Sequence, residues 1–103
     1  MPAAQDEFVA RFARLATPTI ANALDDIAFA GIMTGMTQMV AGTRCAGRAA
    51  TVLQVSSERG DYTSADFKVG HMIDAAGPGA VVVVDNGGRA VSTWGGLATF
   101  AAK

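Results

Sequence analysis

Five consecutive apolar residues at positions 80–84 constrain the fold of this 103-residue chain more than any other feature. They do not alternate with polar residues, which is the pattern of a strand covered on both faces. Apolar residues at positions 69, 72, 73 and 76 predict an amphipathic helix before the strand, ended by Gly77-Pro78. A turn at Asp85-Asn86-Gly87-Gly88 is expected to follow the strand. This order of helix and strand predicts an α/β fold.

Two more helices are predicted near the N-terminus. Apolar residues at helical spacing indicate an amphipathic helix over residues 8–16 that ends near Thr17. Thr17 is expected to cap a second helix, with Pro18 at its first helical position, where a missing N–H costs nothing. Gly31 is expected to stop that second helix.

The middle of the chain predicts one clear strand. Residues 48–55 are rich in β-branched side chains and predict a strand, whereas the glycines and methionines of residues 31–47 suggest loops around a short strand. Residues 56–61 predict a polar turn. Thr63 followed by Asp66 resembles a capping box that would start the helix containing residue 69.

The composition fits one folded domain and argues against several kinds of partner. Half of the residues are hydrophobic, and eight Lys and Arg against nine Asp and Glu give a net charge of −1 without a basic cluster, so nucleic-acid binding is disfavoured. No run approaches the roughly 20 apolar residues that span a bilayer. Cys45 is the only cysteine, which excludes an intrachain disulfide and a Cys-rich zinc site. Because no signal-peptide pattern precedes Thr17, we expect a cytoplasmic protein.

The Gly95-Gly96 step is the most informative local feature for function. Residues 95–103 are expected to open a helix, whose first-turn N–H groups are free to bind an anion. Glycines let a ligand approach the backbone closely, so a carboxylate or phosphate would fit there. The alternative interpretation is a tight turn that packs the helix against a sheet.

Other candidate residues carry weaker signals, and we assign no catalytic or metal-ligating residue within the chain. The Asp85-Asn86-Gly87-Gly88 sequence could be compared with the glycine loop of a methyltransferase or nucleotide-binding fold. However, no further Gly follows at the usual spacing and Arg89 stands where a small residue is wanted, so a β-turn is favoured. His71 has no second His or Cys with which to share a metal. Asp25 and Asp26 are adjacent on a helix and point in different directions.

Four segments in order resemble the RraA-like family, which includes 4-hydroxy-4-methyl-2-oxoglutarate aldolase. They are residues 17–25, 47–52, 78–85 and 94–97, which read TPTIANALD, GRAATV, PGAVVVVD and WGGL. The resemblance implies a swivelling β/β/α domain that assembles as trimers or hexamers. Residues 1–103 would then form the N-terminal part of a single RraA-like domain.

The resemblance also implies a reaction. Aldolase members of this family use a divalent metal, commonly Mg²⁺, to cleave 4-hydroxy-2-oxo acids to pyruvate and to decarboxylate oxaloacetate. A metal chelated by the substrate's carboxylate and 2-oxo group would stabilise the pyruvate enolate that both reactions generate. The family's glycine-rich helix start, whose backbone N–H groups hold the substrate, matches Gly95, Gly96, Leu97 and Ala98 here.

Two departures from the family pattern shape these expectations. Asn22 stands where many relatives carry Asp. The family's Asp-Gly…Arg-Asp motif, which supplies a substrate-binding arginine and an aspartate of the metal shell, is expected beyond Lys103. We therefore expect this chain to be inactive alone and to self-associate through exposed apolar surface. The alternatives are a protein-binding regulator of ribonuclease activity, as in some family members, and a methyltransferase, which the incomplete glycine pattern does not support.

Overall fold

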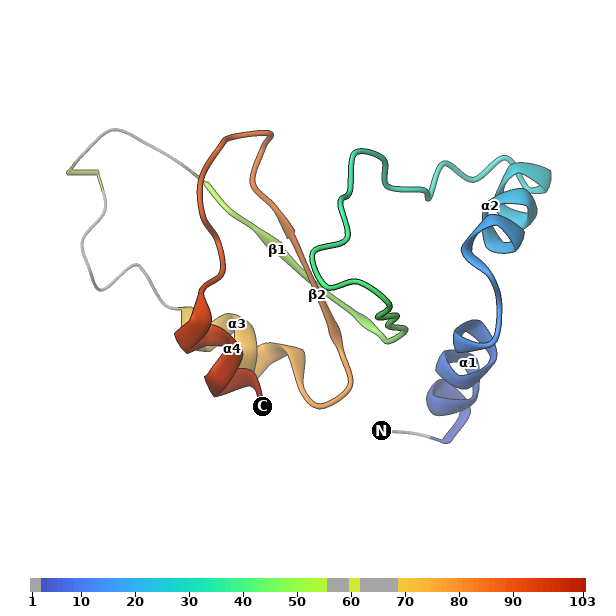
Figure 1. Cartoon of the computed structure of the whole chain (residues 1–103), viewed down its shortest axis with the longest axis horizontal. Coiled ribbons are helices and arrows are strands. Elements are labelled where there is room, and N and C mark those ends of the chain that lie inside the picture. Colours follow the sequence, from blue (N-terminus) through green and yellow to red (C-terminus); the bar gives the residue numbers. More distant parts are fainter. Residues whose placement is uncertain (1–2, 56–59, 62–68) are drawn as a thin grey trace. The chain divides into compact units, whose positions relative to one another are not determined.

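The computed structural model describes residues 3–55, 60–61 and 69–103. The described elements, in chain order, are α1 (Ala3–Ala13), α2 (Thr17–Asp26), β1 (Ala49–Leu53), α3 (Val69–Ala76), β2 (Val81–Asp85) and α4 (Gly96–Ala102), as Figure 1 shows. The chain divides into two compact units, residues 1–46 and residues 47–103. Helices together with a small parallel sheet confirm the predicted α/β class; that residues 1–103 belong to one domain stays a prediction.

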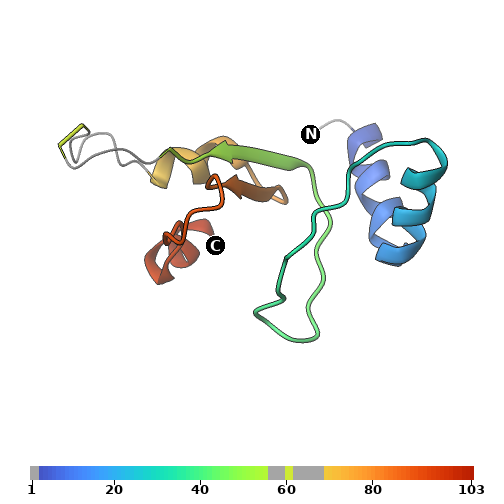
Figure 2. The ribbon, with the colours of Figure 1, turned by 90° about the horizontal axis from the view of Figure 1, so that it is seen from above.

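A parallel pair of strands, with the described helix α3 between them in sequence, organises the unit of residues 47–103. β1 and β2 pair in parallel, from Ala49 opposite Val81 to Leu53 opposite Asp85. Parallel neighbours need a crossover connection, and the crossover contains α3, which contacts both strands (Figures 1 and 2). α4 contacts α3. Because α3 contacts both the strands and α4, the start of α4 belongs to the same unit as the sheet.

The two strands differ in how their side chains are covered. In β1, Ala50 and Val52 are half-buried and the residues that alternate with them are exposed, whereas residues 81–84 of β2 are all half-buried. No side chain in the described part of the chain is fully buried. The prediction that β2 is covered on both faces is thus met only in part, since α3 is the one described helix in contact with the strands.

The helix α3 follows its sequence pattern. Met72, Ile73 and Ala76 are half-buried, while His71 is exposed on the same helix. Gly77 ends the helix in a left-handed conformation with φ of 72°, which favours glycine. The predicted amphipathic helix and its glycine stop are confirmed. The predicted polar turn lies mostly outside the described residues, and the capping box of Thr63 and Asp66 lies wholly outside them.

The first turn of α2 corrects the predicted cap. Ala16, not Thr17, is the N-cap, because its carbonyl oxygen accepts the N–H groups of Thr19 at 3.0 Å and Ile20 at 3.2 Å. Thr17 is already helical and no side chain caps this helix. Pro18 lies in the first turn, where its missing N–H breaks no helical hydrogen bond.

The end of α2 corrects a second prediction, because the helix stops at Asp26 and not at Gly31. Ala28 adopts a left-handed φ of 54°. Its N–H donates to Asp25 O at 3.0 Å, and the N–H of Phe29 donates to Leu24 O at 2.9 Å. These two bonds form a Schellman motif, which closes the helix before the chain reaches Gly31.

Replacing Ala28 by glycine should stabilise the end of α2. A left-handed conformation costs a residue with a Cβ about 1–2 kcal/mol, and glycine avoids that cost. We expect Ala28→Gly to raise the free energy of unfolding by about 1 kcal/mol in urea titrations. Ala23→Gly, in the exposed middle of the same helix, is the matched control and should lower it by about 0.5–1 kcal/mol. Equal losses for both variants would contradict the observed motif.

The segment of residues 31–47 contains no strand, so the predicted short strand is wrong. A compact turn replaces part of it. Gln38 Nε2 donates to the carbonyl oxygens of Val40 at 3.0 Å and Thr43 at 2.7 Å, and Thr43 Oγ1 donates to Val40 O at 2.6 Å. Such local side-chain bonds occupy carbonyl oxygens that a sheet ladder would otherwise use.

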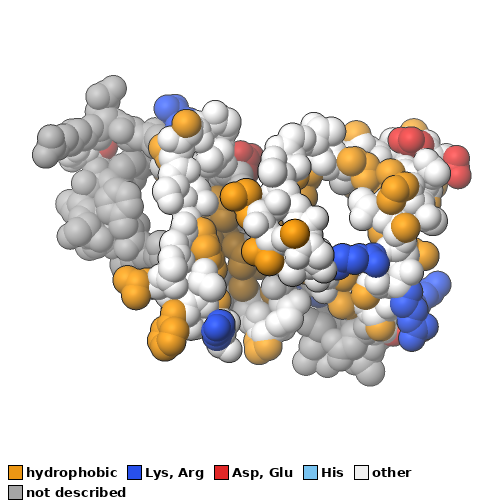
Figure 3. Space-filling model, in the orientation of Figure 1, with side chains coloured by type: hydrophobic (Ala, Val, Ile, Leu, Met, Phe, Trp, Pro, Cys, Tyr) orange, Lys and Arg blue, Asp and Glu red, His pale blue; other side chains and the backbone are white. Residues whose placement is uncertain are grey.

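Large apolar side chains lie at the surface of both units, as the orange side chains in Figure 3 show. Met39 is 87% exposed in the first unit, and Leu97 is 88% exposed in the second. None of the helices in the described ranges is both long and apolar enough to span a bilayer.

Candidate functional site

The start of α4 presents free backbone donors. Gly95 is the N-cap, with an extended backbone (φ −139°, ψ −179°), and Gly96 is the first helical residue. The N–H of Thr99 makes the first α-helical bond, to Gly95 O at 3.1 Å. The N–H groups of Gly96, Leu97 and Ala98 therefore precede the helical ladder and have no acceptor within it. The predicted helix opening at the Gly95-Gly96 step is confirmed.

The space beside the Gly95-Gly96 step is open. A Cβ atom added at Gly95 or Gly96 would meet no atom within 4 Å, apart from its chain neighbours and the helix's own backbone. Of the described elements, α4 contacts α3 and neither strand. The alternative interpretation, a turn that needs glycine to pack the helix against the sheet, is therefore not what this structure shows.

Two side chains hold the first turn of α4 in place. The indole Nε1–H of Trp94 donates to Thr99 Oγ1 at 2.7 Å, and Thr99 Oγ1 donates to Gly95 O at 3.2 Å. Thr99 thus accepts one hydrogen bond from Trp94 and donates another to Gly95. These two bonds fix Trp94 and Gly95 relative to the first turn of α4. Nothing in the spacing of Trp94 and Thr99 signals this contact, because a five-residue separation belongs to no regular helical pattern.

Removing the hydroxyl group of Thr99 should loosen the start of α4. Thr99→Val keeps the side-chain shape but removes both hydrogen bonds, and we expect a loss of about 1 kcal/mol in the free energy of unfolding. Trp94 is the only tryptophan in the sequence, so its fluorescence should shift to longer wavelength as the indole gains water contacts. Thr93→Val is the matched control, since Thr93 is half-buried beside the site and outside this hydrogen-bonded chain. An unchanged spectrum in Thr99→Val would show that the contact does not hold Trp94.

The loop after β2 forms the predicted turn. The N–H of Gly87 donates to Asp85 Oδ1 at 2.8 Å, and the N–H of Gly88 donates to Asn86 Oδ1 at 3.2 Å. Asn86 Nδ2 donates to Arg89 O at 2.8 Å, and both glycines have positive φ, of 68° and 76°. The carboxylate of Asp85 and the amide of Asn86 are thus used to shape a turn, which is how these residue types act in turns.

The remaining candidate side chains are all exposed. His71 is exposed on α3, and Asp25 and Asp26 are exposed on α2 in the other unit. Asn22 is also exposed on α2. Within residues 3–55, 60–61 and 69–103, no three His, Cys, Asp or Glu side chains gather closely enough to hold a metal ion.

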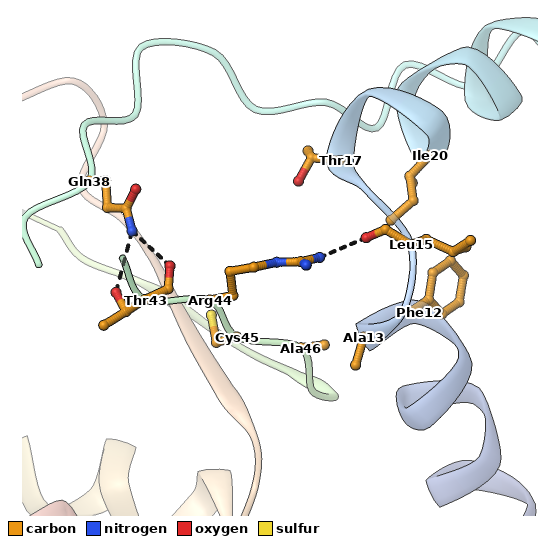
Figure 4. A pocket seen from close by; sticks show the side chains of 10 residues that line it. All are labelled: Phe12, Ala13, Leu15, Thr17, Ile20, Gln38, Thr43, Arg44, Cys45 and Ala46. Carbon is orange, nitrogen blue, oxygen red and sulfur yellow. Dashed lines mark hydrogen bonds between the residues drawn. The ribbon is translucent and has the colours of Figure 1, made fainter. Parts of the chain in front are cut away.

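Sequence reasoning missed a pocket in the unit of residues 1–46 (Figure 4). Its volume is about 630 Å³. Ten residues line it: Phe12, Ala13, Leu15, Thr17, Ile20, Gln38, Thr43, Arg44, Cys45 and Ala46. They come from two stretches that are separated along the chain, so no local motif could have indicated that they meet.

Comparison with protein-family models identifies a family for this chain. The family model RraA-like, described as Aldolase/RraA, matches residues 17–103. No curated protein and no solved structure matches the chain. The matched range contains α2, the β1-α3-β2 arrangement and α4, and leaves out α1.

Proposed function

Because the chain belongs to the RraA-like family, we propose that it is part of a divalent-metal-dependent lyase that cleaves 4-hydroxy-2-oxo acids to pyruvate. Oxaloacetate decarboxylation would be a side activity, and the β1-α3-β2 arrangement would be part of a swivelling β/β/α domain. The observation that supports this proposal is the accessible start of α4. There Gly95, Gly96, Leu97 and Ala98 present backbone donors on an open surface.

In this proposal the start of α4 holds the substrate by its carboxylate. The N–H groups of Gly96, Leu97 and Ala98 would donate to the carboxylate oxygens, and hydrogen bonds to a charged group are stronger than those between neutral groups. A Cβ atom at Gly96 would meet no atom within 4 Å, so there is space for a carboxylate beside the first of these donors. Thr99, which donates to Gly95 O and accepts from the indole of Trp94, would keep these donors in one geometry.

The two proposed substrates share one feature: each is a 2-oxo acid in which the C3–C4 bond breaks. A 4-hydroxy-2-oxo acid loses the proton of its C4 hydroxyl, the C3–C4 bond breaks, and the electron pair forms the enolate of pyruvate, which is then protonated at C3. Oxaloacetate gives the same enolate when carbon dioxide leaves. A divalent metal would stabilise the negative charge of this enolate.

Metal ligands cannot be assigned among the described residues. No three His, Cys, Asp or Glu side chains gather closely enough there to hold a metal ion. The role proposed for the described residues is to bind and orient the 2-oxo acid. We also propose a homotrimeric or hexameric assembly in the cytoplasm, following the family resemblance.

A protein-binding regulator of ribonuclease activity is the second candidate function. It is favoured by the large apolar side chains on α4, where Leu97 is 88% and Phe100 is 78% exposed. An exposed apolar pair at this spacing on one helix is a common feature of protein-binding surfaces. This function would be preferred if the protein bound a ribonuclease but did not bind pyruvate.

The proposed function predicts binding without turnover for the 103-residue polypeptide. The sequence contains no adjacent Arg-Asp pair, so neither residue of the family's later motif is available to complete the site. We expect pyruvate release from 4-hydroxy-4-methyl-2-oxoglutarate or oxaloacetate to stay at the rate of a Mg²⁺-only control. A coupled lactate dehydrogenase assay measures this release. Turnover well above the control, and lost on mutation of Gly96, would show that the later motif is unnecessary.

A further inference from the structure

The pocket in the unit of residues 1–46 is lined by one charged side chain, Arg44, and by several apolar ones. We propose that it binds a small organic carboxylate with an apolar body, of the size of an aromatic acid. Its volume of about 630 Å³ lies within the range of small-molecule sites, which is roughly 300–1,000 Å³. All ten lining residues belong to one compact unit, so the pocket does not depend on how the two units are arranged.

One wall of the pocket is apolar. Phe12 comes from the last turns of α1, Leu15 from the link between the helices, and Ile20 from α2 (Figure 4). Phe12 is 51% and Leu15 is 40% exposed, so both still have apolar surface that a ligand could cover. Burial of this surface would favour a ligand with a hydrocarbon or aromatic part over a fully polar one.

The opposite side of the pocket supplies the charge. Arg44 is the only charged residue among the ten that line the pocket, and its side chain extends across it toward the helices (Figure 4). Its Nη2 donates to Leu15 O at 2.7 Å. A guanidinium group has five N–H donors, so this single bond leaves others for a ligand.

No acidic side chain in the pocket neutralises Arg44. None of the lining residues is Asp or Glu, and the bond to Leu15 O goes to a neutral carbonyl group. The planar guanidinium group matches the geometry of a carboxylate. Charge complementarity therefore selects an anion, and the apolar wall selects one with a larger body than pyruvate. Gln38 Nε2 is already committed to Val40 O and Thr43 O and is not needed for recognition.

Cys45 provides a direct reporter of occupancy. It lines the pocket, it is exposed, and it is the only cysteine in the sequence, so alkylation by iodoacetamide reports on this position alone. Benzoate is the probe, and benzamide, which is close in shape but uncharged, is its control at equal ionic strength. We expect benzoate to slow alkylation in a saturable manner and benzamide to have little effect.

Substitution of Arg44 tests the role of the charge. Arg44→Gln should raise the benzoate concentration for half-maximal protection by about tenfold or more, because a hydrogen-bonded charge is lost. Arg11→Gln makes the same change in net charge on α1 outside the pocket lining and should leave protection unchanged. Equal protection by benzoate and benzamide, unchanged protection in Arg44→Gln, or no protection by benzoate would overturn the proposal. If Arg44→Gln does not fold, the comparison of benzoate with benzamide on the unaltered chain decides the question.

Discussion

Gly96→Pro is expected to weaken pyruvate binding by about tenfold to a hundredfold. The substitution removes one N–H donor, and loss of a hydrogen bond to a charged group costs about 1.5–3 kcal/mol. Gly96 is the first helical residue, the position at which proline is best tolerated in a helix. Gly95 is extended, which is the conformation that a following proline favours. The variant should therefore lose the donor without losing the helix, and isothermal titration calorimetry with pyruvate measures the difference.

Gly95→Ala is the matched control for this prediction. The φ of Gly95 is negative, at −139°, and an added Cβ meets no atom within 4 Å, so alanine fits without strain. Its pyruvate affinity should stay close to that of the unaltered chain. Circular dichroism must first show that both variants fold. Normal pyruvate binding by folded Gly96→Pro would remove the anion-site assignment.

Gly47→Ala is expected to lower the free energy of unfolding by about 1–3 kcal/mol, the usual cost of forcing atoms into filled space. A Cβ at Gly47 would clash with the backbone oxygen of Gly79 and would lie 3.1 Å from Val81 Cγ2. Next to this contact the N–H of Val81 donates to Arg48 O at 2.8 Å, where the pairing of β1 and β2 begins. The backbone must therefore separate at the start of the sheet to admit the methyl group.

The control for Gly47→Ala changes stability in the opposite direction. Gly70 lies inside α3, is exposed, and has no atom within 4 Å of an added Cβ outside its chain neighbours and the helix's own backbone. Gly70→Ala should raise the free energy of unfolding by about 0.5–1 kcal/mol, because alanine loses less entropy in a helix. Urea titrations of both variants measure the two effects. If Gly47→Ala changes the free energy of unfolding as little as Gly70→Ala does, in either direction, the close approach of Gly47 to Gly79 is contradicted.

The predictable part of the fold is the part set by local periodicity. The helix α3, the strand β2 and the turn at Asp85 are confirmed, because apolar spacing and turn residues act over a few positions. The ends of α2 were mispredicted. A capping residue was expected at Thr17, but the backbone of Ala16 takes that position without a side-chain bond. Glycine was expected to end the helix, but Ala28 adopts the left-handed conformation that glycine would adopt more easily.

In the candidate site, too, only the features set by neighbouring residues in the sequence are predictable. The helix opening at Gly95 and Gly96 was predictable because it depends on consecutive residues. The bond between Trp94 and Thr99 was not, because it depends on how two side chains meet across an irregular turn. The pocket beside Arg44 was also unpredictable, since residues 12–20 and 38–46 form it together only after the chain folds back.

Amide chemical shifts of the ¹⁵N-labelled protein, titrated with pyruvate, show whether the start of α4 binds the carboxylate. We expect the largest shift changes at the N–H groups of Gly96, Leu97 and Ala98, which precede the helical ladder of α4. Pyruvamide, which lacks the carboxylate charge, should cause much smaller changes at the same positions. Carboxylate binding at the start of α4 is contradicted if pyruvate leaves these three amides unchanged while other signals shift, or if pyruvamide shifts them equally.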